Sequence, residues 1–288
     1  MKIKNLFNKE KPVISFEVFP PNKNFTKEKL ISITADLAKL NPDFISITYG
    51  AGGANKSGTI EISSHIKNNL NIEVMSHLTC IGSTKHDIAD YIKEVKKNNI
   101  ENILALRGDI PQGRDESIYD EGDYRYASDL IKDLKADGSF SIGAAFYPET
   151  HFESNDIKDL IHLKKKVDSG ADFLISQIFF DNNEFFNFIE QTEKLDIHVP
   201  LSAGIMPVTN AAQIKKITQL CKSSIPKKLE KILDKFGDNP ESMKKAGFIY
   251  ATEQIVELLA NDIQGIHLYA MNRPDVAEAI MNSIALVS

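Results

Sequence analysis

The sequence has few cysteines, no excess of basic charge, no tryptophan and no long apolar runs. Cys80 and Cys221 are the only cysteines among 288 residues, which excludes a disulfide framework and a Cys/His zinc motif. The net charge of −6 argues against nucleic acid as the main partner. No stretch approaches the length of a membrane span, and the run after the first lysines contains Glu17 and stops at Pro20, unlike a signal peptide. We therefore expect a cytoplasmic protein that binds small molecules and no membrane.

What the sequence does contain is a repeated alternation of strand-like and helix-like segments. In the helix-like segments apolar residues recur at i, i+3 and i+7, as at Leu30, Ile33 and Leu37. Residues typical of helix N-caps are Thr26, Ser57 and Asn155. The β-branched and aromatic runs occupy residues 13–19, 44–49, 72–80, 102–106, 140–147, 173–180, 199–206 and 265–271.

Eight strands that alternate with helices predict parallel pairing with right-handed crossovers. The number of strands favours closure into an α/β fold of the (β/α)8 TIM barrel type, with residues 1–288 as one catalytic domain. The last crossover is too long for one helix, so extra helices are expected at 211–221, 226–236 and 240–260. An open doubly wound sheet is the alternative. It would normally carry a glycine-rich turn after the first strand, where this chain has Pro20, Pro21 and Asn22.

Polar residues gather at the predicted C-terminal ends of the strands, where a barrel has its active site. Glu17 is the most informative, because Phe16 and Phe19 flank it in a strand that should be buried. A buried carboxylate must be paired or neutralised through a raised pKa. The first possibility is a structural ion pair, and the second is a proton donor at the mouth of the barrel.

Two further patterns each allow a structural and a functional interpretation. Arg107 and Asp109 flank Gly108, either as a salt bridge at a strand end or as charges near a cofactor that the glycine lets approach. A second set lies on one helical stripe, as a solvated face or as a surface for a phosphate and a sugar hydroxyl: Asp159, His162 and Lys166. No metal site is expected, because no H-x-H or carboxylate spacing connects His77, His151 and His267.

Several of these segments together resemble the methylenetetrahydrofolate reductase family. The match runs in order from about residue 13 to residue 273, and only the combination of segments is specific. The segments with the clearest resemblance are Ser15-Phe16-Glu17-Val18-Phe19-Pro20-Pro21, Ile47-Thr48-Tyr49-Gly50-Ala51, His77-Leu78-Thr79-Cys80, Leu104-Ala105-Leu106-Arg107-Gly108-Asp109, Gln177-Ile178-Phe179-Phe180-Asp181, Gly204-Ile205-Met206-Pro207 and Asn272-Arg273.

This resemblance implies a barrel that holds FAD and uses NADH or NADPH to reduce 5,10-methylenetetrahydrofolate to 5-methyltetrahydrofolate in a ping-pong reaction that serves methionine synthesis. It implies that Glu17 is the general acid and that Asp109 is a carboxylate near the flavin. It implies folate binding by Gln177, Tyr269 and Arg273. The FAD shell that it implies is Thr48, His77, Leu106, Arg107, Gly108, Asp109, Tyr126, Ala127, Ala145, Tyr147, His151, Asp159, His162 and Lys166. A homo-oligomer is expected.

The chain departs from the family pattern at one important position. Ala211 stands where well-studied bacterial members have a phenylalanine that covers the nicotinamide and the folate, so Phe179 or Phe180 is expected to supply that wall. His162 replaces a frequent asparagine. Two alternatives stay open: a proline-dehydrogenase-like flavoenzyme, and a Schiff-base or metal-dependent lyase or hydrolase. A Schiff-base enzyme would need a lysine on a strand, and a metal-dependent enzyme would need clustered histidines. No predicted strand carries a lysine.

Overall fold

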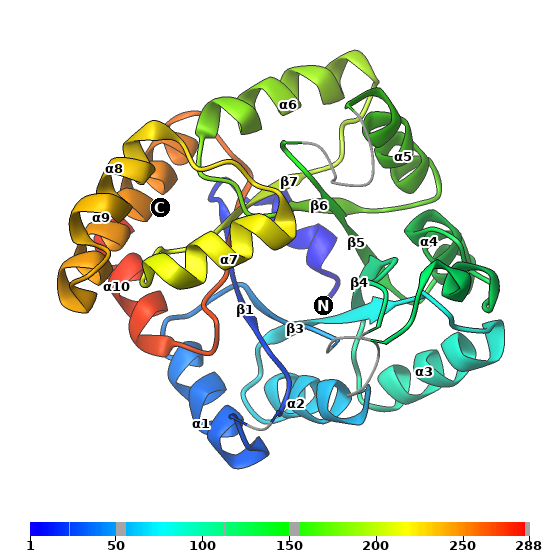
Figure 1. Ribbon diagram of the computed structural model, residues 1–288. Coiled ribbons are helices and arrows are strands. Elements are labelled where there is room, and N and C mark those ends of the chain that lie inside the picture. Colours follow the sequence, from blue (N-terminus) through cyan, green and yellow to red (C-terminus); the bar gives the residue numbers. More distant parts are fainter. Residues whose placement is uncertain (23, 50–55, 112, 150–155, 286–288) are drawn as a thin grey trace.

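Eight parallel strands form a closed barrel in the computed structural model, which describes residues 1–22, 24–49, 56–111, 113–149 and 156–285 (Figure 1). Each strand pairs with the next in sequence, and β1 pairs with β8 to close the sheet. This confirms the predicted TIM barrel. The strands are β1 (Val13–Val18), β2 (Phe44–Ile47), β3 (Glu73–Thr79), β4 (Asn102–Leu106), β5 (Ser141–Phe146), β6 (Phe173–Ser176), β7 (Leu201–Ile205) and β8 (Gly265–Leu268).

Helices surround the barrel in Figure 1, with η1 near its centre. The predicted extra helices of the last crossover are confirmed as α7 (Ala211–Cys221), α8 (Lys227–Phe236) and α9 (Pro240–Ala260), and α9 packs against both α8 and α10. The remaining helical segments are η1 (Ile3–Asn8), α1 (Lys27–Ala38), α2 (Lys56–Asn68), α3 (Lys85–Lys97), η3 (Glu116–Asp120), α4 (Ala127–Asp137), α5 (Asp156–Asp168), α6 (Asn182–Lys194) and α10 (Pro274–Ile284).

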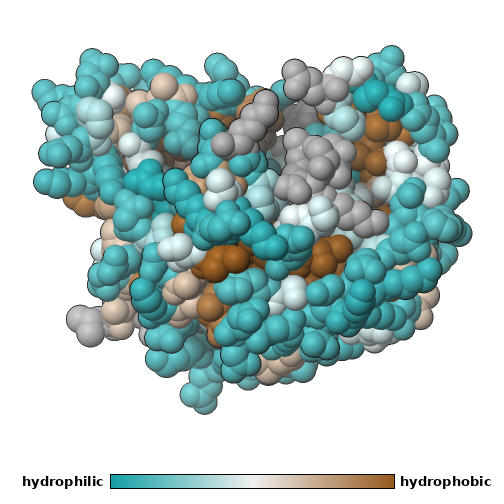
Figure 2. Space-filling model, turned by 90° about the horizontal axis from the view of Figure 1, so that it is seen from below, coloured by the Kyte–Doolittle hydropathy of each residue, from teal (hydrophilic) through white to brown (hydrophobic). Residues whose placement is uncertain are grey.

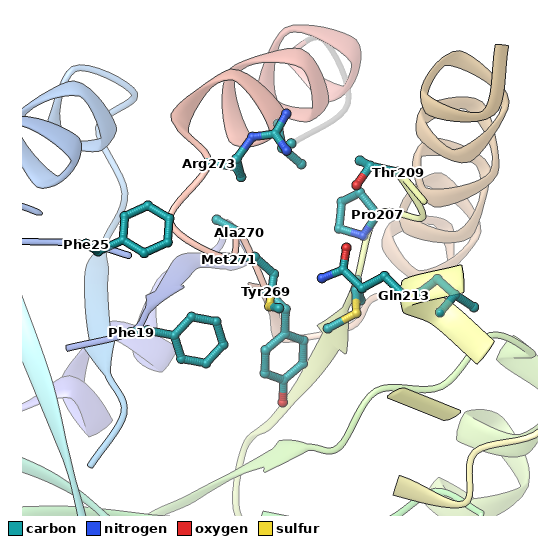
Figure 3. Close-up of a pocket in the computed structure, with 12 residues that line it drawn as sticks. Phe19, Phe25, Pro207, Thr209, Gln213, Tyr269, Ala270, Met271 and Arg273 are labelled. Carbon is teal, nitrogen blue, oxygen red and sulfur yellow. The ribbon is translucent and has the colours of Figure 1, made fainter. Parts of the chain in front are cut away.

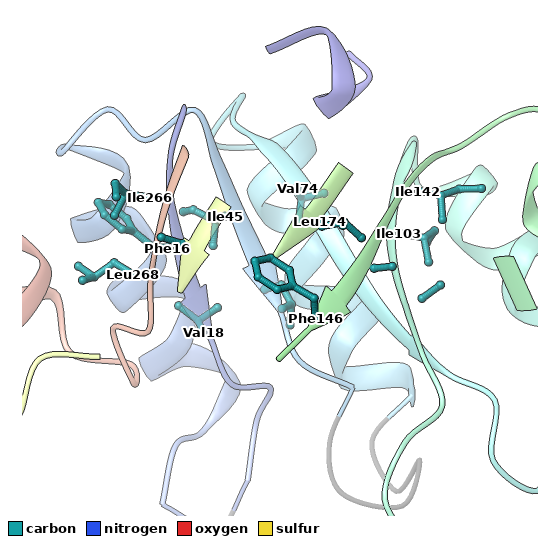
Figure 4. Packing of buried hydrophobic residues seen from close by; sticks show 14 of the residues in the cluster. Phe16, Val18, Ile45, Val74, Ile103, Ile142, Phe146, Leu174, Ile266 and Leu268 are labelled. Atoms are coloured by element: carbon teal, nitrogen blue, oxygen red, sulfur yellow. The ribbon is translucent and has the colours of Figure 1, made fainter. Parts of the chain in front are cut away.

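Alternate residues of each strand face opposite sides of the barrel wall, as the period of two requires. The outward set packs beneath the helices in the main core and includes Phe16, Ile45 and Leu268 (Figure 4). The inward set is apolar at the N-terminal end of the strands, where Phe44 and Phe173 cluster with residues of η1. Toward the C-terminal end the inward positions become polar. At the N-terminal end the polar side chains of Asn102 and Ser141 are engaged by N–H groups of η1, so the polar groups that can face a ligand lie at the C-terminal end.

The structure corrects the predicted ends of several strands, and β6 is the clearest case. The apolar run at 173–180 continues beyond Ser176, but Phe179 and Phe180 leave the sheet. Phe179 is fully buried and stacks on Phe185 of α6 at 4.9 Å between ring centroids, and the Phe180 carbonyl accepts a hydrogen bond from Tyr250 of α9. These residues pack against the outer helices. The expectation that either one walls the ligand pocket is wrong, because the apolar character reflects helix packing.

The predicted N-caps have three outcomes. Thr26 is confirmed, because its hydroxyl accepts a hydrogen bond from the Lys29 N–H at the start of α1. Ser57 is wrong, because α2 already begins at Lys56 and Ser57 lies inside the helix. Residue types alone place a helix start only to within one or two positions. Asn155 lies outside the described residues, just before α5.

The surface seen from the side of α1 and α2 is mainly hydrophilic, with hydrophobic side chains gathered near the middle of the view (Figure 2). Within the described ranges, none of the helices combines the length and the apolar character needed to cross a membrane.

Candidate active site

Glu17 lies at the centre of a buried polar cluster inside the barrel. Its Oε2 atom is 3.5 Å from Nε2 of His77 on β3 and 3.5 Å from Nε2 of His267 on β8. The Ser46 hydroxyl of β2 donates to the same oxygen at 3.5 Å. Only 9% of Glu17 is exposed. Four neighbouring strands of the barrel thus contribute polar side chains to a cluster around one carboxylate. The sequence predicted Glu17 but not the residues that surround it.

His267 connects this cluster to β8. Its Nδ1 atom lies 2.7 Å from the Ser15 hydroxyl, the residue opposite it in the β1–β8 register. The ring of Tyr269 meets the imidazole edge-on at 5.2 Å, and the Tyr269 hydroxyl donates to the Ser176 carbonyl at 2.8 Å. Sequence reasoning considered His267 only as a metal ligand. The alternation of inward and outward residues along the strands could have placed His267, because Ser15 and Glu17 lie on the same inward face of the barrel.

The structure corrects the expected pKa of Glu17. Burial raises the pKa of this carboxyl, but the hydrogen bond from His267, the charges of His77 and His267, and the Ser46 hydroxyl lower it, so that the pKa lies below the ordinary value. Burial lowers the pKa of His77 to about 4, although the Glu17 charge opposes this shift. Of the two alternatives that the sequence leaves open, these surroundings favour a paired carboxylate in the free protein, and the sequence could not show that histidines from β3 and β8 surround it.

An apolar pocket lies beside the cluster at the C-terminal ends of β1, β7 and β8 (Figure 3). Its volume is about 230 Å3. Figure 3 shows Phe19 and Phe25 on one side, Pro207 and Thr209 on the other, and Tyr269 between them. Met206, Gln213, Ile214, Ala270, Met271, Arg273 and Val276 complete the lining. Sequence analysis named Tyr269 and Arg273 but missed Phe25, because a loop has no periodic pattern that marks it.

The outer edge of the pocket is shaped by the segment between β8 and α10. Met271 and Asn272 both adopt positive φ angles, of 53° and 57°, which non-glycine residues seldom do. The Asn272 amide oxygen accepts a hydrogen bond from the Phe19 N–H at 2.8 Å and so joins the ends of β1 and β8. Arg273 follows directly, and its guanidinium binds the Asp275 carboxylate through two hydrogen bonds of 2.9 Å. Strain of this kind is typical of functional sites.

A second group of predicted residues gathers around the ends of β4 and β5 and along α5. The Lys166 ammonium is buried and donates to the Ala145 carbonyl at 2.8 Å. Burial lowers its pKa to about 8, Asp159 raises it and Arg107 lowers it, so these three charges lie near one another. The ring of His162 lies 5.3 Å from the ring of Tyr126. The stripe of Asp159, His162 and Lys166 on α5 is therefore partly buried against the rest of the protein and is not a fully solvated face.

The other predicted residues lie along the same strand ends. Gly108 has a φ of 91°, and a Cβ there would meet the Thr79 side chain at 2.9 Å, so glycine is required. Asp109 is exposed but close enough to Tyr147 to influence its titration. The Gln177 amide oxygen accepts from the Ile178 N–H at 2.9 Å. Thr48 and Leu106 are half-buried and Ala127 is buried at the start of α4. His151 lies outside the described residues.

Neither a metal centre nor an aromatic at position 211 contributes to the pocket. In the part of the chain that the structure describes, no group of three or more His, Cys, Asp or Glu side chains is placed to hold a metal ion. Ala211 is half-buried at the start of α7, and its Cβ packs toward Gly237, which directly follows α8.

Comparison with known proteins gives consistent results. The profile of a family described as methylenetetrahydrofolate reductase matches residues 2–285. The chain is 34% identical over 274 residues to the 5,10-methylenetetrahydrofolate reductase of Escherichia coli (strain K12), with 95% of this chain and 90% of that protein covered. It is 35% identical over 298 residues to methylenetetrahydrofolate reductase (NADH) 1 of Arabidopsis thaliana, with 99% of this chain and 50% of that protein covered. The chain therefore spans about half the length of such plant relatives.

The fold also occurs in solved structures of low sequence similarity. An uncharacterized protein from Clostridium thermocellum, described as binding two copies of 5-methyl-5,6,7,8-tetrahydrofolic acid, superposes with a TM-score of 0.64. The two chains are 18% identical, and the match covers 98% of this chain and 96% of the other. At this identity the likeness shows a common fold.

Proposed function

Because the chain belongs to the methylenetetrahydrofolate reductase family, we propose that it reduces 5,10-methylenetetrahydrofolate to 5-methyltetrahydrofolate with NADH or NADPH, through bound FAD. The observation that carries this proposal is a buried carboxylate, Glu17, that lies 3.5 Å from Nε2 of His267 beside an apolar pocket whose edge bears Arg273. Such a pocket can hold the ring system of a folate while a proton donor works at its inner end. Residues 1–288 act in this proposal as one catalytic unit.

The residues at the ends of β4 and β5 fit a dinucleotide that contains a diphosphate. Lys166 is a buried ammonium next to Arg107, and two cations in a partly buried position favour an anionic group. Gly108 lets the backbone after β4 pass closely along Thr79. When bound, FAD supplies a hydride carrier that the reduced nicotinamide and the folate can use in turn. The residues proposed to hold it are Thr48, His77, Leu106, Arg107, Gly108, Asp109, Tyr126, Ala127, Ala145, Tyr147, His151, Asp159, His162 and Lys166.

Folate binding is assigned to Gln177, Tyr269 and Arg273. The Gln177 oxygen is engaged by the Ile178 N–H, so the amide N–H groups of this side chain remain as donors for the pterin. Arg273 uses two of its donors on Asp275 and retains others for a glutamyl carboxylate. Asp109, a carboxylate near Tyr147, stabilises the cationic intermediate of the folate by its charge.

Glu17 is the proposed proton donor that opens the five-membered ring of the substrate. In the free protein its carboxylate is stabilised by His267, so the proton has to arrive when the pocket fills. Burial is the largest influence on this pKa and acts upward. A bound ring that covers the remaining exposed part of Glu17 removes water from the carboxylate and raises the pKa from its lowered value in the free protein. Glu17 takes up this proton from water as its pKa rises, and His267, fixed by Ser15, keeps Nε2 3.5 Å from the carboxylate and so holds the carboxyl in place.

The decisive experiment separates the two half-reactions. Purified protein loaded with FAD should be yellow, lose its flavin absorbance anaerobically with NADH or NADPH, and regain it with methylenetetrahydrofolate. Glu17→Gln should keep the first step and slow the second by about 100-fold or more, because the amide cannot donate the same proton. Glu94→Gln, an exposed change on α3, is the control. Protein that binds no added FAD, or an equal loss of both steps in Glu17→Gln, would contradict the proposal.

A further inference from the structure

Two phenylalanines form one complete side of the pocket. Phe19 follows the end of β1, and Phe25 lies in the segment between β1 and α1. In Figure 3 both rings stand opposite Pro207 and Thr209, with the open space between the two sides. The polar lining groups, Thr209, Gln213 and Arg273, belong to the other side and the edge. The space between the phenylalanines and Pro207 is therefore suited to a flat apolar ring.

The backbone holds Phe25 in place without a ligand. Its N–H donates to the carbonyl and to the side-chain oxygen of Asn22, at 3.2 and 3.1 Å, and its carbonyl accepts from the Asn22 N–H at 2.9 Å. The Lys29 ammonium lies 4.9 Å from the centre of the Phe25 ring. A ring that is ordered in advance loses little conformational freedom on binding, which favours affinity.

The Ala211 side chain packs between two helices and does not line the pocket. Ala211 packs with the cluster that contains Ile214 and Leu233, between α7 and α8. A Cβ at Gly237 would lie only 3.1 Å from the Cβ of Ala211, so the two backbones approach closely there. Ala211 is not among the residues that line the pocket. A large side chain at 211 would have to displace the end of α8 before it could reach the ligand.

We propose that Phe25 is a substrate-binding residue whose ring packs against the p-aminobenzoyl ring of the folate and supplies the aromatic wall that position 211 does not. The proposal rests on the folate reductase function proposed above and extends it to a residue of the β1–α1 segment. The pterin needs several hydrogen-bond partners, which this side of the pocket does not offer. The p-aminobenzoyl ring needs an apolar face, and its carboxylate-bearing chain would then extend toward Arg273.

The test measures folate binding and flavin reduction separately in FAD-loaded enzyme. Phe25→Ala should raise the KM for methylenetetrahydrofolate and the Kd for the probe p-aminobenzoyl-glutamate by roughly tenfold, because a buried ring contact of this size is lost. At saturating NADH, anaerobic flavin reduction should keep its wild-type rate, because the substitution removes a binding contact and leaves the reacting groups in place. Phe25→Tyr should retain wild-type affinity. Phe25→Leu, which keeps apolar volume, should bind the probe more weakly than Phe25→Tyr.

Phe248→Ala is a matched control. Phe248 on α9 is also half-buried and also has a lysine ammonium over its ring, from Lys244 at 5.5 Å, but it does not line the pocket. The Phe248→Ala substitution should leave probe binding unchanged. Ala211→Phe should not restore binding to Phe25→Ala. If the wild-type enzyme reduces folate, then unchanged probe binding in Phe25→Ala, or restoration of binding by Ala211→Phe, would overturn the inference. A wild-type enzyme that reduces flavin but not folate would refute the proposed function instead.

Discussion

The Ser15 hydroxyl lies 2.7 Å from Nδ1 of His267, and this contact decides which nitrogen of the imidazole faces Glu17. The other nitrogen, Nε2, points at the Glu17 carboxylate, which accepts hydrogen bonds. The Ser15 contact at Nδ1 thus fixes the orientation and the tautomer of the ring, with Nε2 toward the carboxylate. Ser15 acts as a positioning residue for His267 opposite Glu17.

Ser15→Ala should slow folate reduction by about tenfold, because the ring loses the hydrogen bond that fixes its tautomer. Flavin reduction by NADH should not change, and the pH profile of the folate step should shift. Rapid-mixing absorbance at the flavin band measures both steps. Ser202→Ala is a suitable comparison, since the Ser202 hydroxyl is a buried strand hydroxyl with no hydrogen-bond partner among the described residues. A Ser15→Ala enzyme with an unaltered pH profile would exclude the positioning role.

The stability of the fold should depend on pH through His77. Its folded-state pKa is about 4, below the ordinary histidine value of 6.5, so the unfolded chain binds the proton first as the pH falls. The stability contributed by the neutral ring is complete above pH 6.5 and is lost as the pH falls toward 4. Between pH 6.5 and 5 the loss should be about 2 kcal/mol. Urea denaturation at both pH values measures it.

His77→Gln should remove most of this pH dependence, because glutamine does not titrate. His86→Gln, an exposed substitution in α3, should leave the dependence as it is in the wild type. The lowered pKa of Glu17 acts in the same direction, but only below the ordinary carboxyl range. A pH dependence that persists in His77→Gln between pH 6.5 and 5 would assign the effect to another group.

FAD affinity should fall as the pH rises above about 8, the pKa of Lys166 in the empty site. The cofactor diphosphate favours the charged ammonium, so above this pH binding must first protonate the lysine. Lys166→Met should weaken FAD binding by about 10- to 100-fold and abolish this pH dependence. Quenching of flavin fluorescence measures the affinity. Lys165→Met changes the charge by the same amount at an exposed neighbouring position and should bind FAD like the wild type.

Gly247→Ala should destabilise the protein by about 2 kcal/mol and weaken folate binding. A Cβ at this position of α9 would overlap the Val208 carbonyl, which belongs to the segment that carries Pro207 and Thr209 into the pocket. In an unobstructed helix the same change stabilises by about 1 kcal/mol, so helix propensity predicts the opposite sign. Thermal unfolding distinguishes destabilisation from stabilisation, and binding of p-aminobenzoyl-glutamate measures the effect on the pocket. An increase in stability would show that α9 shifts without cost.

The fold was predictable because barrel strands and helices carry local patterns. The boundaries of α7 and α9 agree with the prediction, since the chain marks them with Asn210 and Asn239 as N-caps. The C-terminal ends of strands were less predictable. An apolar residue such as Phe179 packs equally well on either side of the strand end, and the choice depends on where α6 and α9 lie.

The candidate site was predictable as a set of strand ends, but not in its chemistry. Glu17 was found from its burial pattern alone. The direction of its pKa shift depends on His77 and His267, which reach it from strands far along the chain, so the local sequence could not supply it. Phe25 was missed for a related reason. Its position is set by three hydrogen bonds with Asn22 within a loop, and only the closed barrel brings that loop opposite Pro207.

The short helix η1 imposes an order on folding during synthesis. The Ile3 N–H binds Asn102 of β4 at 2.7 Å, the Lys4 N–H binds Ser141 of β5 at 3.1 Å, and the Lys4 ammonium pairs with Asp172 at 3.2 Å. A ribosome makes these partners long after residues 3–8. The native contacts of Ile3 and Leu6 therefore cannot be complete until translation has passed Asp172, because their cluster includes Phe173 of β6.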